Sequence, residues 1–351
     1  MSIKKMVLPP LLLLILIAGI IILSKNPAQP SGETKITPAD PIKFSNGFFI
    51  GILPTPEEGQ TFEQAYLEAS KFAQFSPVWG KPTPFYNLAN ELAGQWGQTF
   101  VEHYIRGNGM FPIIQMSFIN QGLTLVTPPG LDDATMDDSR WREAYKQAVL
   151  DVVKVSRPLY LSIGNEVNRW YEKYGANEND PNGFQHYVSL YEEIYDAVKE
   201  ISPTTKVFCT FAREMVNEGR EADISILTMF NPDKMDLLAF TSYPYAVAGI
   251  NEPSDIPQDY YSKLFNYIPN KPFGFSELGW PSIDAFGGER GQADFITKTS
   301  GPLTKEQGMN LQLFGWAWLH DLDKDDRLGL LKRDGTEKIA YSVWKNLLSQ
   351  N

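Results

Sequence analysis

The segment YLSIGNEVNRW, residues 160–170, joins a short apolar run to a carboxylate. Residues 160–163 form a mostly apolar run with no charged side chain, as expected of a strand that is covered on both faces. Gly164 ends the run, so that Asn165 and Glu166 fall where a strand gives way to a loop. In barrels of parallel strands, functional side chains lie at this end of the strands. The segment therefore predicts a buried parallel strand with an acid at its functional end.

Seven other segments have a similar composition, and helical patterns separate them. Two of the helical patterns are clear, since apolar residues recur on one face of residues 141–153 and again on one face of residues 187–201. Eight strands with helices between them predict an α/β fold, a (β/α)8 TIM barrel in a single domain, with an open doubly wound sheet as the alternative. The eight predicted strands lie in residues 46–54, 73–80, 110–119, 158–167, 205–212, 235–245, 271–280 and 311–319.

A second acid follows the seventh predicted strand. Glu277 lies in FGFSELGW, residues 273–280. In a closed barrel the ends of strands four and seven face each other across the mouth, so Glu166 and Glu277 are expected to converge. Two facing carboxyl groups are the apparatus that cleaves a glycosidic bond, because one protonates the departing oxygen and the other attacks or stabilises the sugar carbon. A separation of about 5 Å predicts retention of the anomeric configuration.

These motifs resemble those of a known group of enzymes. IGNEV (163–167) and SELGWPS (276–282) are similar to the strand-four and strand-seven segments of clan A glycoside hydrolases. Within the clan the plant-type β-1,3-glucanases of family 17 are most similar, and SYPYA (242–246) resembles a Tyr-Pro-Tyr segment near their cleft. A resemblance to the β-1,4-galactanases of family 53 is weaker. The resemblance implies a (β/α)8 barrel that hydrolyses a carbohydrate substrate without a cofactor or a metal.

The resemblance also implies roles for individual residues. Glu166 becomes the general acid/base, which calls for a raised pKa, and Glu277 becomes the nucleophile, which calls for a low pKa. One departure is that FSPVWG (75–80) offers no arginine at the end of strand two, where many clan members have one beside the nucleophile. The implied substrate-binding residues are Asn165 at the sugar 2-hydroxyl, Tyr243 as a donor to the nucleophile, Trp280 along the cleft, Trp316 or alternatively Trp318 as the floor of the subsite, and, with less support, Trp79 and Gln115.

Composition narrows the range of partners. The chain has 351 residues, 31 Lys+Arg and 42 Asp+Glu, and a net charge of −11, which argues against nucleic acid and against an anionic membrane surface. Its single cysteine, Cys209, lies in an apolar run and is expected to be a core thiol. DLDKDDRLG (321–329) begins like an EF-hand loop but lacks the required glycine and glutamate, so a solvated acidic loop is expected.

The N-terminus predicts an extracytoplasmic protein. An uncharged run of 18 residues, 6–23, follows two lysines, so residues 1–25 are interpreted as a signal anchor, with a cleaved signal peptide as the alternative. Residues 26–42 are interpreted as a linker and residues 43–351 as the barrel. Membrane contact is expected through the N-terminal segment only, and the protein is expected to be a monomer.

Together these features favour one function and leave two alternatives. The favoured function is a retaining glycoside hydrolase that cleaves β-linkages of an extracellular polysaccharide or oligosaccharide by double displacement. The alternatives are a non-catalytic glycan-binding barrel and an envelope transglycosylase. Product analysis separates the second alternative from hydrolysis, because both reactions use the same residues.

Overall fold

The computed structural model describes residues 35–40, 47–78, 84–120 and 122–350. They belong to one compact unit, Lys35–Asn351. The predicted anchor at residues 1–25 lies outside the described residues. Within the described ranges, no helix combines the length and the apolar character that crossing a membrane requires.

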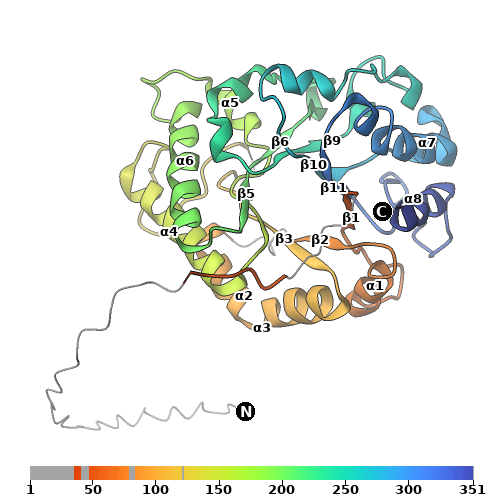
Figure 1. The fold of residues 1–351 in the computed structure, drawn as a ribbon, viewed down its shortest axis with the longest axis horizontal. Helices are drawn as coiled ribbons and strands as arrows, with labels where there is room; N and C mark the ends of the chain where they lie inside the picture. The colour runs from red at the N-terminus through yellow and green to blue at the C-terminus, as the bar shows by residue number, and fades with distance from the viewer. Residues whose placement is uncertain (1–34, 41–46, 79–83, 121, 351) are drawn as a thin grey trace, which may run out of the picture. The chain divides into compact units, whose positions relative to one another are not determined.

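Parallel strands form the centre of this unit, and helices surround them (Figure 1). The strands run in the order β5-β4-β3-β2-β1-β11-β10-β9-β6. Each strand pairs in parallel with its neighbour. Their bounds are β1 Phe49–Ile52, β2 Phe75–Val78, β3 Phe111–Gln115, β4 Tyr160–Ser162, β5 Lys206–Phe208, β6 Thr210–Ala212, β9 Leu238–Ser242, β10 Phe273–Leu278 and β11 Leu311–Trp316, with a separate antiparallel pair, β7 Glu214–Met215 and β8 Arg220–Glu221.

The fifth predicted strand closes the barrel. It consists of β5 and β6, which only Cys209 separates, and β5 pairs with β4 whereas β6 pairs with β9. The two ends of the sheet are therefore halves of one strand, and the alternative of an open doubly wound sheet is wrong. All eight predicted strand segments contain a strand of the barrel. Cys209 is fully buried, and burial raises the pKa of its thiol.

The helices alternate with the strands along most of the chain. Figure 1 shows α8 between α7 and α1, where it completes the ring. The two clearest helical patterns correspond to α4 and α6, and the apolar face of each is buried. The α-helices are α1 Phe62–Ala69, α2 Phe85–Ala93, α3 Gln95–Gly97, α4 Ser139–Ser156, α5 Asn168–Tyr174, α6 Phe184–Ile201, α7 Gly288–Ser300 and α8 Ile339–Gln350, and a π-helical segment, Gln98–Ile105, continues α3.

Alternation along the strands builds two cores. Side chains such as Phe49, Phe111 and Phe208 point into the barrel and pack on one another. Their strand neighbours, such as Ile50 and Phe240, point outward into the larger core between strands and helices. Both faces of the strands are thus apolar, which explains the nearly continuous apolar runs in the sequence.

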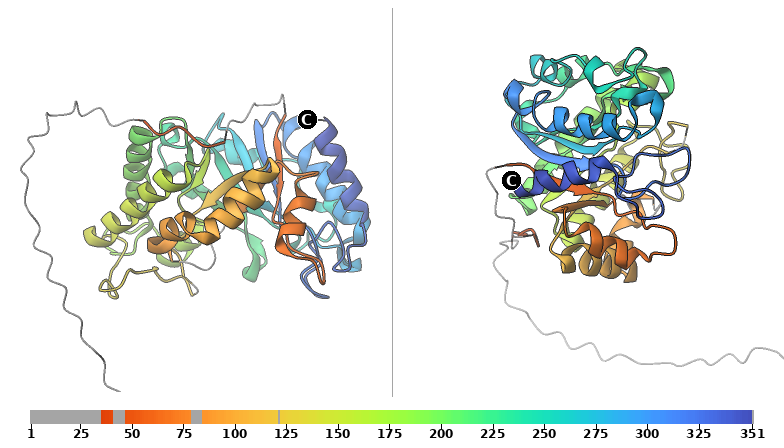
Figure 2. Two further views of the ribbon diagram at one scale, coloured as in Figure 1. Left: turned by 90° about the horizontal axis from the view of Figure 1, so that it is seen from below. Right: turned by 90° about the vertical axis from the view of Figure 1, so that its right-hand side faces the viewer.

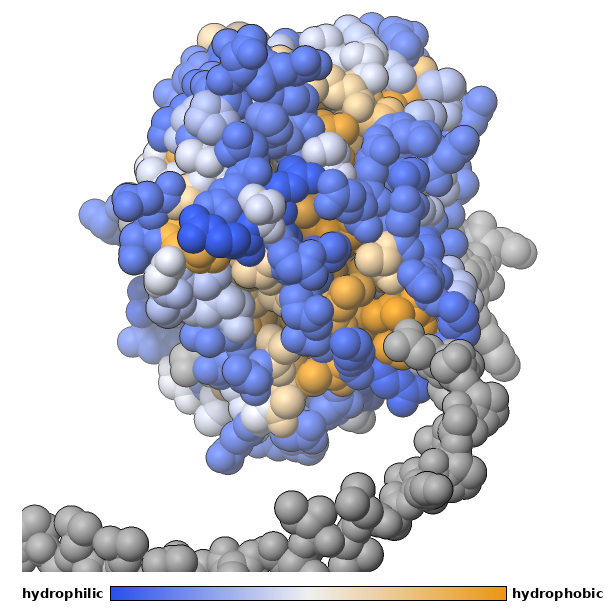
Figure 3. Space-filling model, turned by 90° about the vertical axis from the view of Figure 1, so that its left-hand side faces the viewer, coloured by the Kyte–Doolittle hydropathy of each residue, from blue (hydrophilic) through white to orange (hydrophobic). Residues whose placement is uncertain are grey.

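Residues 35–40, in the predicted linker, contact the barrel. The Ile36 N–H donates to the Ile201 carbonyl at 2.7 Å, and the Asp40 carboxylate pairs with the Arg106 guanidinium at 2.7 Å. Residues 35–40 are therefore part of the folded unit. The side views in Figure 2 show the helices packed around the strands. Figure 3 shows one side of the molecule, on which hydrophilic residues dominate and hydrophobic residues form small patches.

Candidate active site

An irregularity in β10 directs Glu277 into the barrel. In the pairing of β10 with β9, Phe275 is the partner of the outward-facing Phe240, and the register then shifts so that Glu277 is the partner of Thr241. Without this shift Glu277 would follow Phe275 outward, because side chains alternate along a strand. A bulge of this kind reorients a side chain and is common near active sites. Glu277 therefore shares the inner face with Thr241.

Glu166 reaches the same place from a loop. Residues 163–167 leave β4 as a tight turn, and the Val167 N–H donates to the Thr210 carbonyl at 3.0 Å, which ties the turn to the fifth strand. Glu166 itself has φ 48°, a left-handed conformation that costs free energy in a residue with a side chain. Its Oε1 accepts a hydrogen bond from the Thr241 hydroxyl at 2.8 Å, and its Oε2 accepts one from Arg169 at 2.9 Å.

Thr241 connects the two acids. It is the strand partner of Glu277, and adjacent parallel strands lie about 4.8 Å apart. Its hydroxyl contacts the Glu166 carboxylate directly. The structure thus brings Glu166 and Glu277 together, although 110 residues separate them in the sequence.

The electrostatics of this pair differ from the expectation for the nucleophile. Burial first, and then the negative charges of Glu166 and Asp326, raise the pKa of Glu277 well above its ordinary value. The expected low pKa of Glu277 is therefore wrong for the protein in this structure. The physical reason is that Glu277 is only 9% exposed and receives no hydrogen bond from the described residues that would stabilise its charge.

Asp326 is a third acid at the site, and the sequence interpretation missed it. Its Oδ2 accepts a hydrogen bond from the Trp318 indole N–H at 3.2 Å, and its charge raises the pKa values of both Glu277 and Tyr245. Asp326 belongs to DLDKDDRLG, which was expected to be a solvated loop. The sequence could have indicated a role for Asp326, because this residue lies in the loop after strand eight and such loops surround barrel active sites.

The predicted tryptophans differ in their exposure to solvent. Trp280 is 0% exposed, stacks on Phe295 with 5.1 Å between ring centroids, and donates to the Phe286 carbonyl. Trp316 is 1% exposed, and its indole donates to the Leu328 carbonyl at 2.7 Å. The predictions that Trp280 lines a cleft and that Trp316 floors a subsite are therefore wrong, since both rings belong to the core between strands and helices.

Trp318 is the tryptophan of strand eight that remains partly exposed. β11 ends at Trp316, so the strand alternation that would place residues 316 and 318 on one side does not extend to Trp318. Its link to Asp326 places its indole N–H beside an acid that acts on Glu277. Trp79 lies outside the described residues.

Three other predicted residues surround the acids. Tyr243 follows β9, and its ring packs against Gly279, where an added Cβ would lie 2.6 Å from the ring. Between these described residues, no hydrogen bond joins the Tyr243 hydroxyl to Glu277. Asn165 precedes Glu166 and is partly exposed. Gln115 ends β3 and is buried, and its amide nitrogen has no hydrogen-bond partner among the described residues.

A buried acid, Glu214, supports the end of β9. Its carboxyl group accepts hydrogen bonds from the Ser242 hydroxyl, the Tyr260 hydroxyl and the Tyr243 N–H at 2.8, 2.8 and 2.6 Å. Burial nevertheless raises its pKa to about 7. Glu214 follows the fifth strand in FAREM, so its strand-end position was the signal that the sequence offered.

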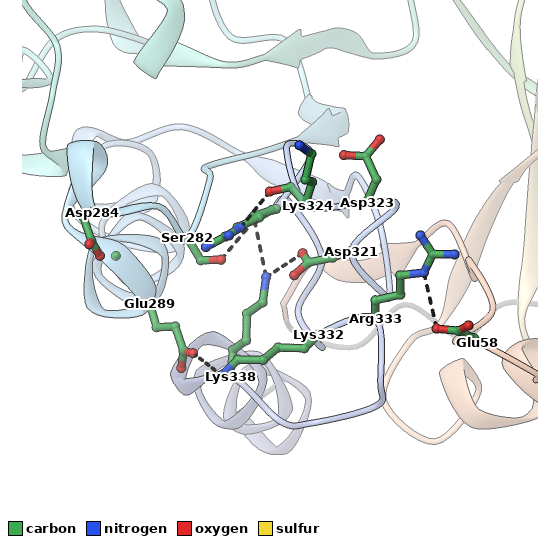
Figure 4. Close-up of a pocket in the computed structure, with 12 residues that line it drawn as sticks. Glu58, Ser282, Asp284, Glu289, Asp321, Asp323, Lys324, Lys332, Arg333 and Lys338 are labelled. Atoms are coloured by element: carbon green, nitrogen blue, oxygen red, sulfur yellow. Dashed lines mark hydrogen bonds and ion pairs between the residues drawn. The ribbon is translucent and has the colours of Figure 1, made fainter.

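The loop between β11 and α8 is held by a buried ion pair beside a polar pocket (Figure 4). Lys338 donates to Asp321 at 2.6 Å and to the Gly329 carbonyl at 2.8 Å, which fixes the loop that carries Asp326. The pocket has a volume of about 750 Å³, and charged side chains of this loop, of the start of α7 and of Glu58 line it. Several of them pair with one another, as Lys332 does with Glu289 at 3.0 Å.

Comparisons with known proteins identify the fold. No protein-family model matches the sequence, and no curated protein matches it. One of the similar solved structures is a GH5_18 protein from Bifidobacterium longum subsp. infantis. Its TM-score is 0.58, its sequence identity is 14%, and the match covers 86% of this chain and 79% of that chain. A family 39 glycoside hydrolase from Bacteroides cellulosilyticus WH2 has a TM-score of 0.58, 16% identity and coverage of 86% and 64%.

A β-glucuronidase from an uncultured Clostridium sp. is also similar, with a TM-score of 0.55, 12% identity and coverage of 87% of this chain and 51% of that chain. The chain thus spans about half the length of that enzyme. At such identities the likeness establishes the fold. The parallel-strand barrel implied by the resemblance to clan A glycoside hydrolases is confirmed.

Proposed function

We propose that this protein is a retaining glycoside hydrolase that acts on β-linked polysaccharides or oligosaccharides. The observation that carries the proposal is the convergence of Glu166 and Glu277 around Thr241 at the carboxyl ends of the strands. A retaining enzyme needs two carboxyl groups close enough for one to attack the sugar while the other protonates the leaving oxygen. The fold shared with glycoside hydrolases supports the same conclusion.

The reaction proceeds by double displacement. Glu277 attacks the anomeric carbon and forms a glycosyl–enzyme ester, while Glu166 gives its proton to the departing glycosidic oxygen. Glu166 then takes a proton from water, and that water attacks the anomeric carbon and releases Glu277. Asn165 and Gln115 supply polar contacts to the sugar, and Trp318 supplies an aromatic surface.

The charge state of the pair sets a requirement for the first step. Glu277 must be ionised to attack, yet its surroundings raise its pKa in this structure. Substrate binding must therefore favour the ionised form of Glu277. Polar sugar groups that donate to Glu277 would favour its ionised form, since hydrogen bonds to a carboxylate lower its pKa.

The finer features of the proposal rest on the sequence. Resemblance to family 17 favours a β-1,3-glucan as substrate, and the weaker resemblance to family 53 a β-1,4-galactan. The N-terminal apolar segment supports action outside the cytoplasm. A monomeric enzyme without cofactor is sufficient for this chemistry.

The decisive experiment is a panel of β-linked polysaccharides and aryl β-glycosides, with products measured by size and anomeric form. Wild-type protein is expected to release shorter chains with retained configuration. Glu277→Gln and Glu166→Gln are each expected to lose activity on natural glycosides by a factor of roughly 10³ or more. Glu143→Gln, a change on the exposed face of α4, is the matched control and should retain activity.

Three outcomes would contradict the proposal in different ways. Binding without turnover over the whole panel would favour the glycan-binding alternative. Products longer than the substrate would favour the transglycosylase. Equal activity of wild type and Glu277→Gln would remove Glu277 from the mechanism.

A further inference from the structure

The environment of Glu166 contains a cation that the proposed mechanism does not explain. Arg169 lies one turn after Glu166, at the start of α5, and its guanidinium donates to Glu166 Oε2 at 2.9 Å. The Arg169 side chain is 43% exposed and that of Glu166 is 23% exposed, so the ion pair faces solvent at the mouth of the barrel. Over the described residues, Glu166 is the one acid that pairs with Arg169.

This contact conflicts with the acid role of Glu166. The Thr241 hydroxyl donates to Oε1, which leaves Oε2 as the oxygen that carries the transferable proton. A guanidinium has only donors and cannot accept a hydrogen bond from a protonated Oε2. Protonation of Glu166 also removes the negative charge with which Arg169 pairs, so the contact weakens and Arg169 becomes available to another anion when Glu166 becomes the acid.

Nearby cations of the same rim already have other partners. The Lys173 ammonium donates to the carbonyls of Gly122 and Leu123 at 3.1 and 2.8 Å. Arg220 pairs with Glu172 at 2.9 Å and also with Glu218. Arg169 differs from both, because its acidic partner is the residue that must be protonated, and therefore uncharged, before it can act as the acid.

We propose that Arg169 forms a leaving-group subsite that selects a sugar bearing a carboxylate. The inference rests on the proposed function, since it requires Glu166 to be the acid. Glu166 protonates the glycosidic oxygen, so a guanidinium beside Oε2 lies on the side of the departing sugar. A carboxylate on that sugar exchanges one anionic partner of Arg169 for another and accepts two parallel hydrogen bonds. A neutral sugar offers no such carboxylate, so the guanidinium then contacts only water.

The test uses matched pairs of oligosaccharides with the same cleaved linkage. In one member the leaving-group sugar is a uronic acid, and in the other its carboxyl group has been reduced to the alcohol. Wild type is expected to show a kcat/KM roughly tenfold higher for the acidic member, mainly through KM. The preference should decline with added salt, because the subsite is partly exposed.

Arg169→Gln is expected to lose the preference, and Arg169→Lys to keep part of it, because an ammonium is a cation without the planar fork. Arg140→Gln removes one positive charge from an exposed ion pair on α4 and should keep the full preference. Thermal unfolding of each variant shows whether it is folded. If Arg169→Gln does not fold, the substrate preference of Arg169→Lys tests the inference instead.

The outcomes distinguish this inference from the proposed function. Equal kcat/KM for both members in wild type, or an unchanged preference in folded Arg169→Gln, would overturn the subsite while leaving the hydrolase intact. Absence of hydrolysis of every glycoside by wild type would overturn the hydrolase itself.

Discussion

At the scale of single residues, Asp326 is one of the groups that influence the ionisation of Glu277. Burial raises the pKa of Glu277 most, the charges of Glu166 and Asp326 raise it further, and attack requires the ionised form. Asp326→Asn is therefore expected to lower the pKa of Glu277 and to move the acidic limb of the kcat/KM profile down by roughly half a unit to one unit. The pH dependence of aryl β-glycoside hydrolysis measures this shift.

A neighbouring acid provides the control for that change. Asp325 is 84% exposed and does not contribute to the raised pKa of Glu277. Asp325→Asn should leave the acidic limb in place. An acidic limb that does not move in Asp326→Asn would show that Asp326 acts only through Trp318.

Trp316, the last residue of β11, and Trp318, which follows the strand, should respond differently to substitution. Trp318→Ala removes a partly exposed ring beside the acids and is expected to raise KM roughly tenfold with little change in stability. Trp316→Phe removes the hydrogen bond to the buried Leu328 carbonyl and should cost about 1–3 kcal/mol of unfolding free energy. Its KM should stay near that of wild type.

Steady-state kinetics and urea denaturation of both variants measure these effects. A larger change of KM in Trp316→Phe than in Trp318→Ala would return the sugar-binding role to Trp316. The core position of Trp316 argues against that result, because its ring is 1% exposed and packs in the core between strands and helices.

At the scale of elements, Glu214 makes the junction of β7 and β9 sensitive to pH. Its pKa in the folded protein, about 7, lies above the ordinary value of 4.5, so the folded state binds more protons than the unfolded state between these values. The free energy of unfolding therefore falls as the pH rises through about 7. From pH 6 to pH 8 the loss from this group is about 1.4 kcal/mol.

Urea denaturation of wild type and Glu214→Gln at both pH values isolates this contribution. The variant should lose about 1.4 kcal/mol less than wild type over the interval, whatever its stability at pH 6. Glu277 contributes a dependence of the same sign in both proteins and cancels in the difference. Parallel curves for the two proteins would show that Glu214 is ionised throughout.

At the scale of the whole molecule, the folded unit begins within the predicted linker. Removal of residues 1–34 should leave the free energy of unfolding unchanged, because the compact unit starts at Lys35. Removal of residues 1–42 also removes Asp40, which leaves the partly buried Arg106 without one of its two acidic partners. That loss, with the backbone bonds of residues 36 and 39, is expected to cost about 3 kcal/mol.

Cell fractionation of the same proteins tests the proposed anchor. The full chain is expected in the membrane fraction, and the protein without residues 1–34 in the soluble fraction. Equal stabilities of the two truncated proteins would show that residues 35–40 do not stabilise the barrel. Recovery of the full chain as a soluble, uncleaved protein would contradict the anchor.

The sequence by itself determined the barrel and the two acids. Continuous apolar runs at regular intervals specify strands that are buried on both faces, and a parallel sheet places the ends of all such strands at one edge. Glu166 and Glu277 were therefore predictable as strand-end residues, and the closed barrel brings the ends of strands four and seven together. Each of these inferences needs only local pattern and strand order.

Only the tertiary structure decided which neighbours surround the acids. Trp280 and Trp316 look like cleft residues in the sequence, but the direction of a side chain depends on register, bulges and the point where a strand ends. Asp326 and Glu214 were missed because their effect on the site comes from burial and from charges that are distant in the sequence. The pKa of Glu277 follows from the same cause, since desolvation and the proximity of like charges are properties of the folded chain.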